Sequence, residues 1–278
     1  MKNEGFDLMD NRPIGIFDSG LGGLTAVKAL KDILPYENIV YFGDTARVPY
    51  GVRGVETIKK FALSDLKFVN SLGVKAVLAA CGTVSSVAMA ELKAEGKVYI
   101  TGVVEATAKK ALIETKNGII GIIGTSATVK SSSYVKYISA HAPSVKTVSK
   151  ACPLFVPLVE NGYFSSENPV VQHVVAEYLS EIKESGADTV ILGCTHYPIL
   201  RDAIGKYLGD GVSLIDSGKE AAAEIAEYLK NNGLLNESGK SGMIEYYVSD
   251  NAEGFAENAG VFLSEEISGS VKKADIDL

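Results

Sequence analysis

The 278-residue sequence has no tryptophan, only three cysteines and only three histidines. An odd number of cysteines with no C-x-x-C pair does not fit a disulfide framework or a structural zinc site. In a reducing cytosol such residues are free thiols. We therefore expect neither disulfides nor a bound metal, and each cysteine is best examined as a thiol.

The sequence also lacks an excess of positive charge and any long apolar run. The 27 Lys and Arg residues against 34 Asp and Glu give a formal net charge of −7, whereas general nucleic-acid and membrane-surface binders are usually basic. No apolar run approaches the roughly 18 residues of a membrane span. Residues 1–10 are polar and acidic, unlike a signal peptide. We expect a cytoplasmic protein that binds neither nucleic acid nor membranes.

Three common site motifs are incomplete or missing. The Gly-Leu-Gly-Gly segment at residues 20–23 follows a predicted strand, but Thr25 stands where G-x-G-x-x-G needs its third glycine. The Gly-Lys-Ser segment at residues 239–241 lacks the earlier glycine of a P-loop, since position 234 is leucine. The G-x-S-x-G elbow of hydrolases is absent. A dinucleotide site, a phosphate-binding loop and a serine-hydrolase site are therefore disfavoured.

Two segments that end in cysteine resemble each other: Val-Leu-Ala-Ala-Cys-Gly-Thr at residues 77–83 and Val-Ile-Leu-Gly-Cys-Thr-His at residues 190–196. Each indicates a buried parallel strand and the loop at its carboxyl end, where open α/β sheets hold ligands. Cys81 and Cys194 are either small buried hydrophobic residues, as free cysteines often are, or two thiols that face one substrate. A helix expected after each loop favours thiols of lowered pKa. Cys152 has no counterpart, and we expect it to be structural.

Strands and helices alternate along the chain, which indicates parallel sheets with right-handed crossovers. A strand and glycine loop at residues 14–20 precede the first cysteine segment, and a similar pair at residues 120–126 precedes the second. This order is typical of an internal duplication. Helices are predicted over residues 55–72 and from Pro169 onward. The last predicted strand covers residues 244–248.

Three other polar side chains are candidates for the same site. Asp18 ends the first predicted strand, where a carboxylate either caps a turn or accepts a proton from a thiol or binds an ammonium group. His196 lies two residues after Cys194 and either packs in the loop or hydrogen-bonds the thiol or a substrate carboxylate. Glu160 lies in a mostly apolar segment and is uninformative alone.

Taken together, the sequence resembles the glutamate racemases, cofactor-independent enzymes of the aspartate/glutamate racemase superfamily. The matching segments occur in order and are Phe-Asp-Ser-Gly-Leu-Gly-Gly-Leu (17–24), Gly-Asp-Thr-Ala-Arg-Val-Pro-Tyr-Gly (43–51), Cys-Gly-Thr (81–83), Gly-Thr-Ser-Ala-Thr (124–128), Cys-Pro-Leu-Phe-Val-Pro-Leu-Val-Glu (152–160) and Gly-Cys-Thr-His-Tyr-Pro (193–198). The resemblance implies two similar α/β domains with mainly parallel sheets, related by a pseudo-twofold axis, with the site in the cleft between them. We expect residues 11–104 and 214–278 to form the first domain and residues 105–213 the second.

The resemblance also implies an activity, the interconversion of L- and D-glutamate that supplies D-glutamate for bacterial peptidoglycan. By position, Cys81 and Cys194 would be the two acid/base residues, supported by Asp18, Glu160 and His196. The residues implied to bind substrate are Asp18, Ser19, Pro49, Tyr50, Gly51, Gly82, Thr83, Thr125, Thr128, Thr195 and His196. No cofactor and no metal are implied, the partner is the small molecule glutamate, and we expect a homodimer.

One position departs from the family pattern, because Gly82 replaces the asparagine of the usual Cys-Asn-Thr. The substitution removes an amide that would contact substrate, so Gly82→Asn should tighten glutamate binding. Two alternatives remain open: a racemase of aspartate or another acidic amino acid, and a non-catalytic relative that binds an amino acid without turnover. The presence of two cysteines disfavours a one-cysteine decarboxylase.

Overall fold

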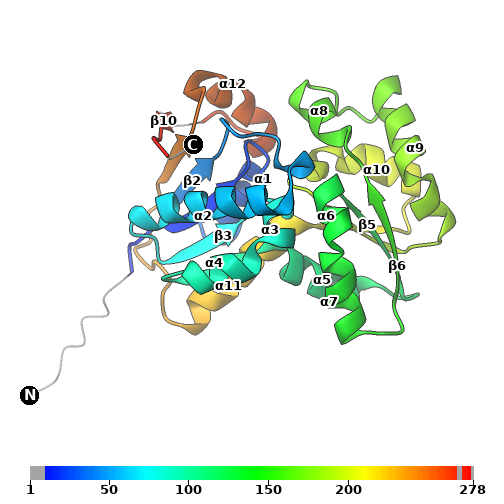
Figure 1. Cartoon of the computed structure of the whole chain (residues 1–278), viewed down its shortest axis with the longest axis horizontal. Coiled ribbons are helices and arrows are strands. Elements are labelled where there is room, and N and C mark those ends of the chain that lie inside the picture. Colours follow the sequence, from blue (N-terminus) through cyan, green and yellow to red (C-terminus); the bar gives the residue numbers. More distant parts are fainter. Residues whose placement is uncertain (1–9, 268–270, 277–278) are drawn as a thin grey trace, which may run out of the picture.

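The computed structural model describes residues 10–267 and 271–276 and contains two parallel β-sheets with helices packed against them (Figure 1). The strand order is β10-β9-β2-β1-β3-β4 in the first sheet and β6-β5-β7-β8 in the second. The α/β class predicted from the alternation of strands and helices is confirmed.

The helices and strands follow one another in near-regular alternation. The first half contains β1 (Ile14–Asp18), α1 (Leu24–Ile33), β2 (Ile39–Gly43), the 3-10 helix η1 (Tyr50–Val52), α2 (Val55–Ser71), β3 (Ala76–Ala79), α3 (Gly82–Val87), α4 (Met89–Glu95), β4 (Tyr99–Gly102) and α5 (Val103–Glu114). The second half contains β5 (Ile119–Gly124), α6 (Ser126–Ser131), α7 (Ser133–His141), β6 (Lys146–Ala151), α8 (Phe155–Glu160), α9 (Pro169–Glu184), β7 (Thr189–Gly193), η2 (Tyr197–Leu200), α10 (Arg201–Leu208) and β8 (Ser213–Asp216). The chain closes with α11 (Ser217–Asn231), β9 (Ile244–Val248), α12 (Ala252–Leu263) and β10 (Val271–Lys273).

The two sheets repeat one topology. Four adjacent strands run β2-β1-β3-β4 in the first sheet and β6-β5-β7-β8 in the second. The glycine loops follow β1 and β5, and the cysteine loops follow β3 and β7, so corresponding loops leave corresponding strands. Because the strands are parallel, both cysteine loops lie at the carboxyl edge of their own sheet.

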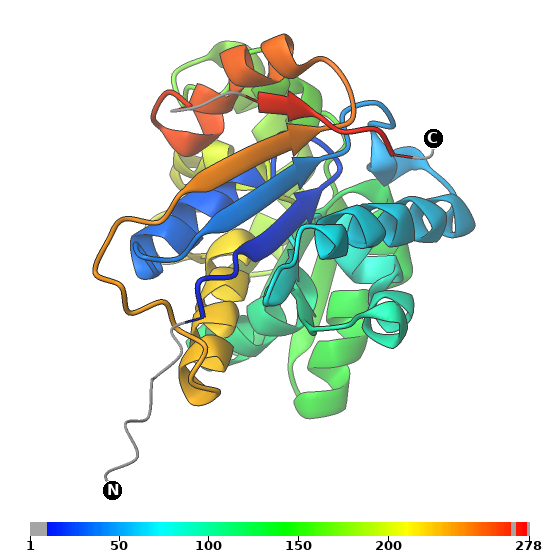
Figure 2. The same ribbon diagram turned by 90° about the vertical axis from the view of Figure 1, so that its left-hand side faces the viewer.

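The end of the chain returns to the first sheet. Strand β9 pairs with β2, and β10 pairs with β9, so both extend the sheet beyond β2 (Figure 2). The strand predicted at residues 244–248 is confirmed as β9. It is not the last strand, because the short β10 follows, whose polar Val-Lys-Lys sequence has no apolar alternation. The expected domain boundary at residue 214 falls inside β8, which pairs with β7 of the second sheet.

Two predicted helices show why these residues fold locally as they do. The helix expected over residues 55–72 is α2, and it ends before Gly73, whose φ of 71° lies in the left-handed region that glycine tolerates. The helix expected from Pro169 is α9, whose first turn is capped by Asn168 through hydrogen bonds from two backbone N–H groups. Their inward stripes bury mainly aliphatic side chains against the sheets. No helix in the described ranges is long and apolar enough to cross a membrane.

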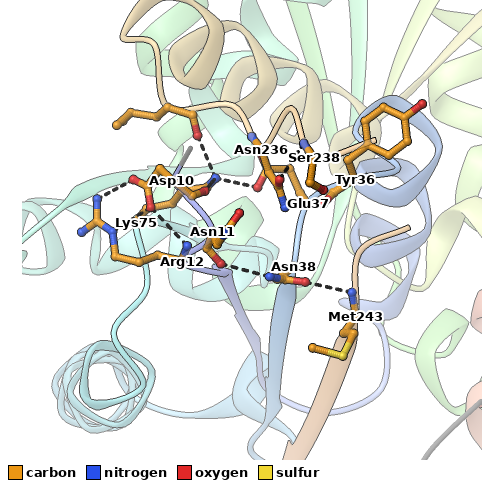
Figure 3. Close-up of polar contacts among 11 residues, drawn as sticks. Asp10, Asn11, Arg12, Tyr36, Glu37, Asn38, Lys75, Asn236, Ser238 and Met243 are labelled. Atoms are coloured by element: carbon orange, nitrogen blue, oxygen red, sulfur yellow. Dashed lines mark hydrogen bonds and ion pairs between the residues drawn. The ribbon is translucent and has the colours of Figure 1, made fainter. Parts of the chain in front are cut away.

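A buried ion pair fastens the amino-terminal edge of the first sheet (Figure 3). Lys75 Nζ lies 2.6 Å from Glu37 Oε2 and donates hydrogen bonds to the carbonyl oxygens of Asp10 and Leu234. The other oxygen of Glu37 accepts a hydrogen bond from the backbone N–H of Asn236. The cluster thereby ties the connection between α11 and β9 to the edge opposite the cysteine loop, since Lys75 immediately precedes β3.

Candidate active site

A cavity of about 320 Å³ lies where loops from the carboxyl edges of the two sheets meet. Predicted residues that line it are Ser19, Pro49, Tyr50, Gly51, Cys81, Gly82, Thr83, Thr125, Glu160, Cys194, Thr195 and His196. Both thiols therefore face one space, from corresponding loops of the two sheets. Asp18 and Thr128 do not line the cavity and lie buried behind it.

The thiol of Cys81 is held at the start of α3. Cys81 occupies the N-cap position of this helix, it is 5% exposed, and its Sγ donates to Ser19 Oγ at 3.5 Å. Burial raises the pKa of the Cys81 thiol to about 11, and the nearby Asp18 carboxylate adds to the increase. Backbone N–H groups at the helix start act in the opposite direction, as predicted, but they are outweighed. The expected net lowering of the Cys81 thiol pKa is thus wrong.

The thiol of Cys194 belongs to a chain of polar groups from the second half. Cys194 follows β7 directly and is 6% exposed, and its Sγ lies 4.0 Å from His196 Nδ1. The other ring nitrogen, Nε2, lies 3.0 Å from Glu160 Oε1 at the end of α8. Burial raises the pKa of the Cys194 thiol, and the charges of Cys81, Asp18 and Glu160 add to that effect. Glu160, uninformative in the sequence, is placed to orient the imidazole.

Packing contacts from α12 and from the glycine loop after β1 also fix the imidazole of His196. The ring of Phe262, from α12, meets it edge-on with centroids 5.2 Å apart. A Cβ atom at Gly22 would lie 2.5 Å from His196 Nδ1, so the backbone of the first glycine loop packs directly on the ring. Phe262 gave no signal in the sequence, because nothing local connects residue 262 to a site assembled from earlier loops.

Asp18 caps the turn after β1, which is one of the two roles considered for it from the sequence. Its side chain is fully buried, and Oδ2 accepts a hydrogen bond from the backbone N–H of Gly20 at 2.9 Å. Within the described residues Oδ1 has no hydrogen-bond partner. Burial raises the pKa of the Asp18 carboxyl group, while the charge of His196 opposes the rise. One oxygen therefore shapes the turn, and the other lies buried behind the cavity.

Hydroxyl groups connect the two halves on another side of the cavity. Thr83 Oγ1 of α3 lies 3.0 Å from Thr125 Oγ1, which caps α6. Thr125 Oγ1 in turn lies 3.0 Å from Thr128 Oγ1 and accepts a hydrogen bond from the Thr128 backbone N–H. Thr128 is 1% exposed, so it can act on a bound molecule only through Thr125.

The loop at residues 48–51 is held from behind by a buried ionic cluster. Tyr50 OH is hydrogen-bonded to Asp44 and, at 3.0 Å, to Asp65 Oδ2. Arg47 pairs with both carboxylates, and Asp44 also accepts a hydrogen bond from Ser249. Sequence reasoning missed this support. Its available signal was Asp65, a charged residue on the otherwise apolar stripe of α2.

The remaining lining residues are mostly apolar or small and were also missed. They are Gly20, Val48, Val52, Ser126, Pro153, Val156, Pro157 and Tyr197. Most of them fall inside the motif segments but carry no group that suggests chemistry by itself. Among the residues that the structure describes, no Lys or Arg lines the cavity, so hydroxyl and backbone N–H groups are its main hydrogen-bond donors there. Across residues 10–267 and 271–276, no three His, Cys, Asp or Glu residues are grouped to hold a metal ion.

Comparison of the sequence with known proteins shows the family to which the chain belongs. The sequence profile described as Asp/Glu/Hydantoin racemase matches residues 25–225. Glutamate racemase of Geobacter metallireducens is 42% identical over 267 residues, covering 96% of this chain and 97% of the relative. Glutamate racemase of Neisseria meningitidis serogroup A is 45% identical over 240 residues, covering 86% and 88%.

Solved structures agree with the sequence relatives. The glutamate racemase of Francisella tularensis in complex with D-glutamate superposes with a TM-score of 0.88 and 38% identity, covering 96% of this chain and 98% of that chain. A Bacillus anthracis glutamate racemase isoform gives a TM-score of 0.91 at 34% identity, with the same coverage. On the match to its profile and on this identity over nearly the whole length, the chain belongs to the Asp/Glu/hydantoin racemase family.

Proposed function

We propose that the protein interconverts L- and D-glutamate without a cofactor, with Cys81 and Cys194 as the two acid/base groups. The observation that carries the proposal is that both thiols line one cavity from corresponding loops of two sheets that share a four-strand order. The substrate follows from the relatives, which are named glutamate racemases at 42–45% identity.

Racemisation needs a proton removed from one face of the α-carbon and another delivered to the opposite face. A thiolate on one side takes the first proton, and a thiol on the other side donates the second. The negative charge moves from the first sulfur through the α-carbon to the second sulfur, and the roles reverse for the other enantiomer. A repeated scaffold that presents one thiol from each half suits this symmetry.

Burial of the thiols has two opposing effects on this chemistry. A raised pKa makes the thiolate scarcer at a given pH but a stronger base once formed, and each pKa unit corresponds to about 1.36 kcal/mol. An α-proton is far less acidic than an ordinary thiol, so the stronger base reduces the mismatch. The substrate's ammonium group would favour the thiolate when it binds beside Cys81, because an opposite charge lowers a thiol pKa.

Each thiol has a different set of supporting groups. In this proposal Asp18, whose charge acts on Cys81, assists on that side, and the His196–Glu160 pair exchanges or orients a proton on the Cys194 side. Hydroxyls of Ser19, Thr83, Thr125 and Thr195 and nearby backbone N–H groups can receive the substrate carboxylates. Such preorganised donors stabilise charge that develops on the carboxylate as the proton leaves.

A direct test follows the optical activity of pure L-glutamate with purified protein and no added cofactor. We expect the signal to decay to zero as equal amounts of both enantiomers form. Cys81→Ala and Cys194→Ala should each abolish the decay, whereas the matched variant Cys152→Ala should retain it, because Cys152 does not line the cavity. A constant signal with the wild-type protein would refute the proposal, and decay with aspartate alone would favour the aspartate alternative.

The use of the product and the oligomeric state are part of the same proposal. We infer that the D-glutamate supplies peptidoglycan synthesis in the cytoplasm and that the protein works as a homodimer. The dimer is tested by light scattering of the eluted protein, and a monomer at working concentration would exclude it.

A further inference from the structure

The two cysteine loops touch each other at Gly82. A Cβ atom built on Gly82 would lie 2.3 Å from the carbonyl oxygen of Gly193 and 3.2 Å from its carbonyl carbon. It would lie 3.6 Å from the Cα of Cys194. Heavy atoms that are not bonded prefer separations of about 3.5–4.0 Å. The backbone after one thiol therefore packs on the backbone before the other, with no room for a side chain.

The Gly193 side of this contact is held in place. Gly193 is the last residue of β7 and is paired in register with Gly124 of β5. A Cβ atom at Gly193 would itself lie 2.7 Å from the carbonyl oxygen of Ile123 and 3.2 Å from the ring of the buried Tyr134. A side chain at position 82 would therefore push α3 and its capping Cys81 away from β7 instead of displacing Gly193.

Gly51 makes a second contact of the same kind at the cavity. A Cβ atom at Gly51 would lie 3.0 Å from Thr125 Cβ, a closer approach than most real side chains make. Gly51 and Gly82 both line the cavity, and in each case bare backbone of the first half meets the second half. The approach at Gly82 is the tighter of the two, and it lies directly between the cysteine loops.

We propose that Gly82 is a positioning residue that sets the distance between the two thiols. The inference rests on the proposed function, because it presumes that both sulfurs must reach one α-carbon. Cys81 precedes Gly82, and Cys194 follows Gly193, so separation at this contact moves the thiols apart. A misplacement of about 1 Å can cost roughly 100-fold in rate. Each thiol can still exchange the proton of the enantiomer it faces, since that step needs only one sulfur.

The contact changes the expectation for the asparagine variant. Gly82→Asn would restore an amide, but its Cβ would meet the same Gly193 carbonyl oxygen at 2.3 Å. We now expect Gly82→Asn to lose racemisation and not to gain affinity for glutamate. Glycine at this position lets the two loops pack closely. Asparagine would supply an amide contact instead, but it would prevent this close packing.

The test compares Gly82→Ala with Gly54→Ala in the full-length protein. Gly54 is the matched control, because its φ of −69° is ordinary and a Cβ there would meet no atom within 4 Å. Racemisation is followed by optical activity, and α-proton exchange of each enantiomer in D₂O is followed by NMR. We expect Gly82→Ala to racemise about 100-fold more slowly while exchange without inversion continues. Gly54→Ala should match the wild type in both measurements.

Several outcomes would overturn the role of Gly82. Wild-type racemisation by Gly82→Ala would show that the contact does not set the thiol distance, and equal loss of racemisation and exchange would indicate general damage to the site. Failure of Gly82→Ala to fold would also contradict it, because displacement at the cavity should leave both sheets intact. Gly51→Ala, with its milder contact, should show a smaller loss of the same kind. If the wild type neither racemises nor exchanges glutamate, the proposed function itself fails.

Discussion

At the scale of single residues, the site depends on two thiols that are buried and yet face a cavity. Burial raises the pKa of both thiols, to about 11 for Cys81. Two neighbours then shift the pKa of the Cys81 thiol in opposite directions. The Asp18 carboxylate raises it by disfavouring a nearby negative sulfur, and the Ser19 hydroxyl lowers it by favouring that charge. These opposing effects are a testable property of the free protein.

The pKa of Cys81 should respond to its two neighbours with opposite signs. Asp18→Asn removes a negative charge, which makes the thiolate easier to form and lowers the thiol pKa below about 11. Ser19→Ala removes a hydrogen-bond partner of the thiolate and should raise the pKa further. The measurement is the rate of Cys81 alkylation against pH, which rises about tenfold per pH unit below the thiol pKa. Shifts of the same sign in both variants would refute this account of the environment.

At the scale of secondary-structure elements, the loop at residues 48–51 is positioned from α2 and the β2 end. Arg47 lies between two carboxylates, and all three groups are almost completely buried. Burial raises the pKa of Asp65 well above its usual value, and the neighbouring Asp44 adds to the increase. Arg47 is the cation that makes this buried pair of acids tolerable.

Arg47→Met should therefore destabilise the protein and loosen this wall of the cavity. Removal of one partner of a buried ion pair costs about 3–5 kcal/mol in the free energy of unfolding, measured by urea denaturation. The control is Lys59→Met, which breaks an ion pair with the exposed Glu56 and the half-exposed Glu91 and should cause little change. Equal stability of both variants and the wild type would show that the cluster does not support the loop.

Among the secondary-structure elements, local sequence predicts some strands and not others. The apolar central strands β1, β3, β5 and β7 were predictable, because strands buried on both faces form short continuous apolar runs. Strand β6 was not, because its Lys-Thr-Val-Ser-Lys-Ala sequence belongs to a partly exposed edge. The short β10 has the same difficulty.

At the scale of the whole molecule, the site exists only where the two sheets meet. The order of glycine and cysteine loops predicted a duplication, and four adjacent strands of the first sheet do have the same order as the four strands of the second. The resemblance in motifs also predicted most of the residues that line the cavity. The contacts of Gly82 with Gly193, Phe262 with His196, and Asp65 with Tyr50 were not predictable, because each joins separate elements through packing that no local pattern records.

The central claim is that each thiol serves one face of a single α-carbon. The most direct measurement is α-proton exchange in D₂O by Cys81→Ala and Cys194→Ala, each given L-glutamate and D-glutamate separately. We predict that neither variant racemises, that each exchanges the proton of one enantiomer, and that the two variants act on opposite enantiomers. Exchange of the same enantiomer by both variants, or racemisation by either one, would contradict the account.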